Sequence, residues 1–162
     1  MFYGGRLASH LSNDDYSTDV KDFISLRRLN RRGVMILDSD REKVNARINK
    51  TKIRLQQEFD IGPGHAWVTE GREIENYIPV AQLKEAIAAV SPGATMQSGF
   101  GKYENCLKIR SKKGRESQVS KVDVARHVVD NNVPEFSRYD LKQRMNKLLK
   151  FIRESNPQVP RP

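Results

Sequence analysis

The sequence has almost no cysteine and no long hydrophobic run. Cys106 is the only cysteine among the 162 residues, so an internal disulfide and a cysteine-rich zinc site are both excluded. No apolar run approaches the roughly 20 residues of a transmembrane helix. The first residues also lack the basic and apolar regions of a secretory signal. These absences predict a cytoplasmic protein that has no membrane partner.

Histidine is scarce, and the sequence has no complete phosphate-binding P-loop. His10, His65 and His127 are scattered without metal-ligand spacing, which is typical of surface or packing residues. Gly101 and Lys102 form a Gly-Lys pair, but the P-loop motif is not matched before or after this pair. Its first glycine is replaced by Met96 and its Ser or Thr by Tyr103. The sequence therefore predicts no ATP site in this chain.

Positive charge is abundant and unevenly distributed. Residues 1–101 carry 14 Lys and Arg against 13 Asp and Glu, whereas residues 102–162 carry 15 against 7. The net charge of +9 therefore lies almost entirely in the second part of the chain. Such asymmetry indicates a polyanionic partner, with nucleic acid as the first candidate and an acidic membrane as the second, although a solvated cationic surface would look the same.

The hydrophobic pattern predicts an α/β fold with a small parallel sheet flanked by helices. A short amphipathic helix is expected from Val20 to Leu29. VMIL at 34–37 is apolar throughout and predicts a buried central strand. Helical spacing follows at 43–59, then a strand at 66–69 and a helix that begins at Pro79. Strand, helix and strand in succession indicate a parallel crossover.

The second part of the chain reads as a loop-rich region followed by helices. We expect a loop at 91–105, a strand at 106–109, a basic loop at 110–117, helices at 122–129 and 138–154, and a disordered tail at 156–162. The basic loop carries the residues most suited to contact DNA phosphates: Arg110, Lys112, Lys113 and Arg115.

Two aspartates end the 34–37 strand, and they allow two interpretations. If extended geometry continues, Asp38 and Asp40 project to the same side. At the carboxyl edge of a parallel sheet they would then suit Mg²⁺ or Mn²⁺. Alternatively, one of these residues caps a following helix, because Ser39 and Glu42 have capping-box spacing. The spacing alone does not separate a metal site from a cap.

Three glutamates follow the next strand. Glu70, Glu73 and Glu75 lie in TEGREIENYIP at 69–79. Acidic residues near the start of a helix are favourable in any protein, but three within six residues exceed what capping requires. A second acidic cluster in a basic chain favours a bound cation between the two clusters.

Four stretches of the chain together resemble one protein family. They are FYGGRLASHLS (2–12), LRRLNR with VMILDSDRE (26–42), NKTKIRLQQEF (49–59) and WVTEGREIENYIP (67–79). In order and spacing they resemble the Toprim nuclease region that follows an ABC-type ATPase in OLD-family (overcoming lysogenization defect) endonucleases. The resemblance covers roughly residues 2–130, with a carboxyl-terminal helical extension at 131–155.

The resemblance implies a metal-dependent DNA endonuclease. By position in the family pattern, Asp38, Asp40 and Glu75 would bind Mg²⁺ or Mn²⁺ in a two-metal site, with Glu73 as a further candidate ligand. Lys121 matches a lysine that would stabilise negative charge on the phosphate during cleavage. A solvated lysine in the first turn of a helix is the plain structural alternative for Lys121.

The family pattern also contains parts that this sequence lacks. An E-G-x-x-D strand is expected before the FYGG block, but the sequence begins with that block, and Glu70-Gly71 follows a different strand. The resemblance therefore implies a carboxyl-terminal fragment whose ATPase domain lies upstream or acts in trans, with a homodimer as a further arrangement. The alternative function is an inactive Toprim remnant that serves as a DNA-binding or regulatory module.

Overall fold

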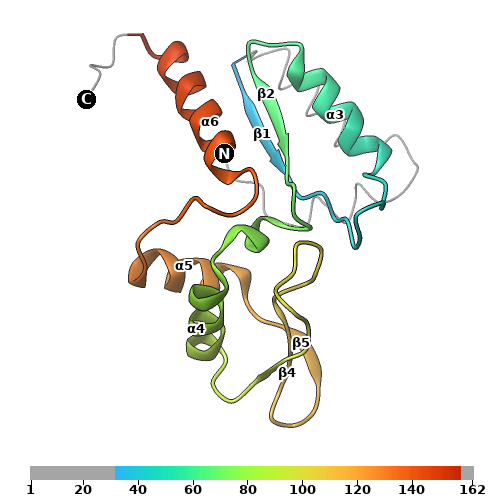
Figure 1. Ribbon diagram of the computed structural model, residues 1–162, viewed down its shortest axis with the longest axis vertical. Coiled ribbons are helices and arrows are strands. Elements are labelled where there is room, and N and C mark those ends of the chain that lie inside the picture. The colour runs from blue at the N-terminus through green and yellow to red at the C-terminus, as the bar shows by residue number, and fades with distance from the viewer. Residues whose placement is uncertain (1–31, 158–162) are drawn as a thin grey trace. The chain divides into compact units, whose positions relative to one another are not determined.

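The computed structural model describes residues 32–157, which form a mixed α/β protein (Figure 1). The predicted helix from Val20 to Leu29 and the FYGG block lie outside the described residues. The helices of the described part are α3 (Lys50–Asp60), α4 (Val80–Val90), α5 (Lys121–Asn131) and α6 (Leu141–Ser155), with a short 3₁₀ helix η1 (Ile74–Tyr77). The strands are β1 (Val34–Leu37), β2 (His65–Val68), β3 (Thr95–Met96), β4 (Lys108–Arg110) and β5 (Glu116–Gln118).

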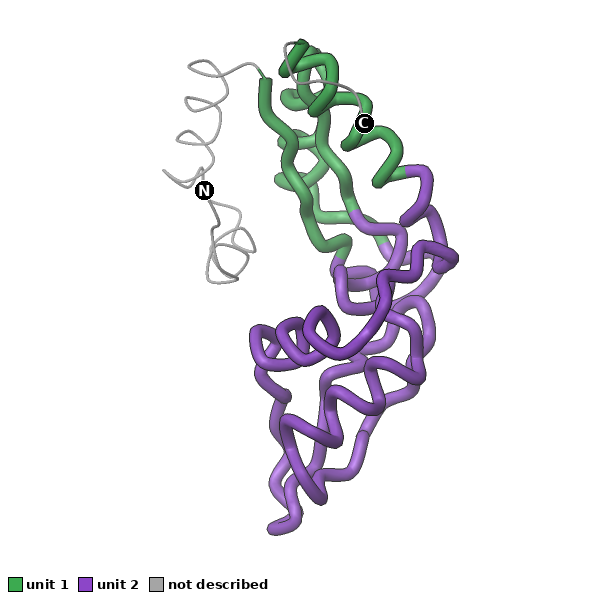
Figure 2. The backbone as a smooth tube through the Cα atoms, turned by 90° about the vertical axis from the view of Figure 1, so that its left-hand side faces the viewer, with its two compact units in different colours: residues 1–39, 47–68, 144–162 green, residues 40–46, 69–143 purple. Residues whose placement is uncertain are grey.

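The chain divides into two compact units that alternate along the sequence (Figure 2). Unit 1 comprises residues 1–39, 47–68 and 144–162, and unit 2 comprises residues 40–46 and 69–143. Each unit draws on segments that are distant in sequence.

Unit 1 contains the parallel sheet that the sequence predicted. β1 pairs with β2 in parallel, with Val34 opposite His65. β2 is buried along its whole length and packs against α3, whose buried residues include Leu55 and Phe59. The prediction of a central strand at 34–37 is wrong in one respect, because Ile36 is 48% exposed. Within residues 32–157, β1 pairs with β2 alone.

The helix predicted at 43–59 is shorter than its hydrophobic spacing indicated. α3 begins at Lys50, where the side chain of Asn49 accepts a hydrogen bond of 2.7 Å from the Thr51 amide. This is the side-chain cap that helix starts prefer. Val44, which belonged to the predicted apolar face, is 70% exposed. The capping box proposed for Ser39 and Glu42 is also wrong, because no helix starts there.

Unit 2 has an antiparallel sheet that the sequence did not predict. β3, β4 and β5 pair in that order, and β4 with β5 forms a hairpin in the region expected to be a basic loop. α4 and α5 pack together over this sheet around a core of apolar residues: Leu83, Ala86, Ile87, Cys106, Leu107, Ile109, Val119 and Val124. The predicted helices at 122–129 and 138–154 are confirmed as α5 and α6, with boundaries shifted by one to three residues.

Cys106 should react very slowly with alkylating reagents while unit 2 is folded. Its thiol is 3% exposed, and burial raises its pKa from 9.0 to about 11. Because the thiolate is the nucleophile, a rise of about two units lowers its fraction at pH 8 by about 100-fold. Iodoacetamide labelling followed by mass spectrometry should therefore be fast in urea and at least about 100-fold slower in buffer. Equal rates in the two conditions would contradict the buried position.

Within residues 32–157, no helix is both long enough and apolar enough to cross a membrane.

Candidate functional site

The GREIENY segment (Gly71–Tyr77) in unit 2 is held by a dense network of hydrogen bonds. It enters η1 through a capping box, in which the side chain of Glu73 and that of Asn76 each accept a hydrogen bond from the other residue's backbone. The Arg72 amide donates to the carbonyl oxygen of Lys102 at 2.8 Å. These bonds fix the backbone on both sides of the acidic residues.

Asn76 is the central side chain of this network. It is 1% exposed, and its amide group makes three hydrogen bonds. The Oδ1 atom accepts from the Glu73 amide at 2.8 Å, and Nδ2 donates to the carbonyl oxygens of Gly101 and Glu104, each at 3.0 Å. A buried side-chain amide needs such partners, because an unpaired polar group is costly to bury. Asn76 therefore ties η1 to the loop that precedes β4.

Tyr77 connects the same segment to the polypeptide before α6. Its hydroxyl group accepts a hydrogen bond from the Glu70 amide at 2.8 Å and donates one to Asp140 at 2.5 Å. The ring of Tyr139 packs edge-on against it, with the ring centroids 5.6 Å apart. Asn76 and Tyr77 thus hold the segment in place, which leaves the preceding glutamates as its candidates for chemistry.

Glu73, Glu75 and Lys121 form one cluster in unit 2. The Nζ atom of Lys121 lies 2.9 Å from Oε2 of Glu73 and 3.1 Å from Oε1 of Glu75. The glutamate side chains are 13% and 10% exposed, whereas the lysine side chain is 43% exposed. Lys121 lies 48 positions after Glu73 and 46 positions after Glu75 in the chain. The structure thus brings together three predicted site residues that are distant in sequence.

Lys121 occupies an unusual position for a lysine. It is the first residue of α5, whose N-cap Ser120 accepts a hydrogen bond from the Asp123 amide. The positive end of the helix dipole disfavours a cation there. Partial burial also disfavours its charged form, but hydrogen bonds and charge interactions with Glu73 and Glu75 outweigh this and raise the pKa of Lys121 above its usual value. Lys121 is therefore fully protonated at neutral pH.

Two arginines add positive charge to this region of unit 2. Nε of Arg72 lies 3.6 Å from Oε1 of Glu73, and its NH1 group lies 3.2 Å from Glu42. Arg41 donates a hydrogen bond to the carbonyl oxygen of Glu70 at 3.0 Å. The sequence did not predict a role for either arginine, although Arg41 follows Asp40 and Arg72 precedes Glu73 in the chain.

The two predicted aspartates belong to different units. Asp40 is in unit 2, where its amide donates to the carbonyl oxygen of Arg72 at 2.9 Å. Its φ angle is +55°, so the extended geometry that would have placed it on the same side as Asp38 does not continue. Asp38 is in unit 1, where its carbonyl oxygen accepts a hydrogen bond of 2.7 Å from the buried Lys52.

The described residues contain no ready-made metal cage. Across residues 32–157, no group of three or more His, Cys, Asp and Glu side chains is arranged to hold a metal ion. The two carboxylates of the cluster nevertheless offer hard oxygen atoms of the kind that Mg²⁺ and Mn²⁺ prefer. They already contact one cation, the ammonium group of Lys121.

The residues predicted to contact DNA lie on the β4–β5 hairpin. Arg110 is the last residue of β4 and pairs with Glu116 at 3.2 Å, so part of its charge is neutralised. Lys112, Lys113 and Arg115 lie in the turn. Lys113 and Arg115 are exposed there. The hairpin thus presents a cluster of basic side chains at its tip.

Comparisons with models of known protein families, with curated proteins and with solved structures found no match.

Proposed function

We propose that this chain is the nuclease region of a Toprim-type, metal-dependent DNA endonuclease related to the OLD family. The observation that supports the proposal most directly is the contact of Lys121 with both Glu73 and Glu75. The sequence resemblance selected these three residues from separate blocks of the chain. A lysine that is merely solvated, the plain alternative, would contact neither carboxylate.

The carboxylates would serve as metal ligands. Within unit 2, Asp40 and Glu75, with Glu73 as an additional candidate, would hold Mg²⁺ or Mn²⁺ through carboxylate oxygens, which matches the donor preference of both ions. The sequence also predicted Asp38 as a ligand, and that residue lies in unit 1. When bound, such ions supply an activated water and stabilise charge on the leaving 3′-oxygen of a phosphodiester. The neighbouring Lys121, protonated at neutral pH, would stabilise the negative charge that develops on the phosphate.

The basic hairpin would hold the DNA. Lys112, Lys113 and Arg115 at its tip would contact backbone phosphates, which positions the duplex without reading its sequence. Binding through phosphates releases counterions from the DNA. The affinity should therefore fall steeply as the salt concentration rises. An ATPase domain, attached upstream or acting in trans, and a second copy of the chain are the partners that the resemblance implies.

Nicking of supercoiled plasmid DNA in Mn²⁺ or Mg²⁺ tests this proposal. We expect nicking by the chain, or by a version extended by an upstream E-G-x-x-D strand, and no nicking in EDTA. Glu75→Gln and Lys121→Met should each reduce the rate by about 100-fold or more, because each removes a group that orients or stabilises the reacting phosphate. Asp130→Asn, which changes an exposed carboxylate on α5, is the matched control and should retain the full rate.

Two outcomes would count against the nuclease proposal. If both the chain and its extended version bind plasmid but never nick it, the alternative of a DNA-binding or regulatory module is favoured. If nicking occurs and survives Glu75→Gln, the assignment of the metal ligands is wrong.

A further inference from the structure

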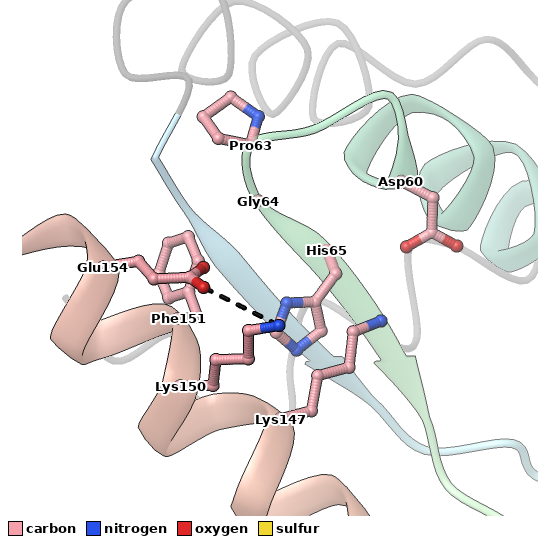
Figure 3. A pocket seen from close by; sticks show the side chains of 8 residues that line it. All are labelled: Asp60, Pro63, Gly64, His65, Lys147, Lys150, Phe151 and Glu154. Carbon is pink, nitrogen blue, oxygen red and sulfur yellow. Dashed lines mark ion pairs between the residues drawn. The ribbon is translucent and has the colours of Figure 1, made fainter.

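Unit 1 contains a pocket that the proposed nuclease chemistry does not use. It has a volume of about 390 Å³ and lies between the start of β2 and the carboxyl-terminal half of α6 (Figure 3). Pockets of this size are large enough for a small organic ligand. The lining residues are Asp60, Pro63, Gly64, His65, Lys147, Lys150, Phe151 and Glu154.

His65 forms the inner wall of this pocket. It is the first residue of β2 and is 6% exposed. Phe151 on α6 packs edge-on against its imidazole, with the ring centroids 5.8 Å apart and the planes at 84°. The two rings and Pro63 give the pocket an apolar side. A ligand would therefore meet a rigid, largely aromatic surface at this position.

Positive charge dominates the electrostatics at His65. Burial lowers the pKa of its imidazole, and the charge of Lys147 lowers it further, with a smaller contribution from Arg144 in the same direction. Asp60 opposes them. Lys147 thus acts on the imidazole from within the lining, and Lys150 is the second lysine there, whereas Asp60 and Glu154 are its two carboxylates.

The acidic side chains of the lining are already engaged. Oδ1 of Asp60 accepts a hydrogen bond of 3.1 Å from the Ala66 amide. Glu154 pairs with Lys150 at 3.7 Å, and both side chains are largely exposed, at 65% and 76%. An exposed pair at this separation is weak. Lys150 can therefore exchange Glu154 for an anionic ligand at little cost.

We propose that this pocket binds a small molecule that carries a phosphate group. Lys147 and Lys150, one helical turn apart on α6, extend toward β2 beside His65 (Figure 3) and would hold the phosphate oxygens. The rings of Phe151 and His65 would contact the remainder of the ligand. The pocket volume exceeds what a phosphate ion alone needs, so a phosphate ester such as a nucleoside monophosphate fits it better than inorganic phosphate.

This pocket is separate from the proposed metal ligands. His65 begins β2, whereas Asp38 follows the last residue of β1, and the two strands are parallel. The two residues therefore lie at opposite ends of the sheet in unit 1. The ligand proposal does not depend on the nuclease proposal, and either can fail alone.

NMR of the histidine side chains tests the proposal on the intact chain. The protein has three histidines, so His65 can be assigned by its loss in His65→Gln. Adenosine 5′-monophosphate and inorganic phosphate are titrated separately. We expect the nucleotide to shift the His65 resonances saturably and to raise the His65 pKa, because a bound phosphate stabilises the imidazolium ion. The charged groups around His65 are the same in both titrations, so a difference between the two probes comes from the ligand. These groups are Asp60, Arg144, Lys147, Lys150 and Glu154.

A double variant separates pocket binding from general attraction to a basic surface. Lys147→Gln with Lys150→Gln should weaken nucleotide binding at least about tenfold through lost charge-assisted hydrogen bonds. Lys142→Gln changes a lysine on the same helix outside the lining and should leave the affinity within about twofold. Equal binding of both probes would contradict the preference for a phosphate ester over inorganic phosphate. No saturable shift by either probe, or an unchanged affinity in the double variant, would overturn the proposal.

Discussion

Replacing Asn76 with alanine should destabilise unit 2 by about 3–5 kcal/mol, because three hydrogen bonds are lost and their partners stay buried. The carbonyl oxygens of Gly101 and Glu104 would each lose a donor, and the Glu73 amide would lose its acceptor. The side chain is 1% exposed, so water cannot replace it without rearrangement. The start of η1, which positions Glu75, would loosen at the same time.

Denaturant titration followed by thiol labelling measures this effect. Cys106 is the only cysteine and lies in the core of unit 2, so its labelling reports the opening of that unit. The labelling midpoint should fall markedly in Asn76→Ala. Asn131→Ala is the matched control, because Asn131 is exposed and makes a single hydrogen bond of 2.9 Å to the His127 carbonyl oxygen. Similar midpoints in the two variants would show that Asn76 does not hold the segment.

Gly64→Ala should destabilise unit 1 by about 3 kcal/mol, which is the upper range for forcing extra atoms into a packed site. A Cβ atom at this position would lie 2.0 Å from the carbonyl oxygen of Gly33 and 3.0 Å from its carbonyl carbon. That same oxygen accepts a hydrogen bond of 3.2 Å from the His65 amide at the start of the parallel pairing. Backbone atoms cannot rotate away as a side chain would, so the strands must separate locally.

Trp67 gives a direct readout for this second variant. It is the only tryptophan, it lies in β2, and it is 3% exposed. Its fluorescence in urea should show a lower unfolding midpoint for Gly64→Ala than for the original chain. Gly62→Ala tests the backbone penalty without a clash, because Gly62, also in unit 1, has φ +77° and nothing within 4 Å of an added Cβ. It should cost about 1 kcal/mol. A Gly64→Ala midpoint equal to that of the original chain would contradict the close approach.

Sequence patterns predicted the helices and strands that carry a continuous apolar face. The strand at 34–37, the strand near 66–69 and the helices α4, α5 and α6 all follow from hydrophobic spacing. The start of α3 was missed because Val44 continues the helical spacing, although the Asn49 cap begins the helix later. β5 was missed because its three residues are exposed and polar. Only its pairing with β4 makes it a strand.

The candidate site was predicted in part. The choice of Glu73, Glu75 and Lys121 came from a family resemblance, and the structure brings these three side chains together in unit 2. Local patterns could not have predicted that Asn76 and Tyr77 act as anchors, because all of the partners named above except Glu73 lie 7 to 63 positions away. The pocket beside His65 was missed for the same reason, since its walls come from β2 and α6.

The chain passes between the two units at four points, after residues 39, 46, 68 and 143. Neither unit is therefore a contiguous stretch that could be expressed by truncating the gene. A single protease cut after residue 46 would leave both units with residues on each side of the break. Genetic dissection of this protein must therefore use point substitutions or circular permutation, because a deletion from either end first removes residues of unit 1.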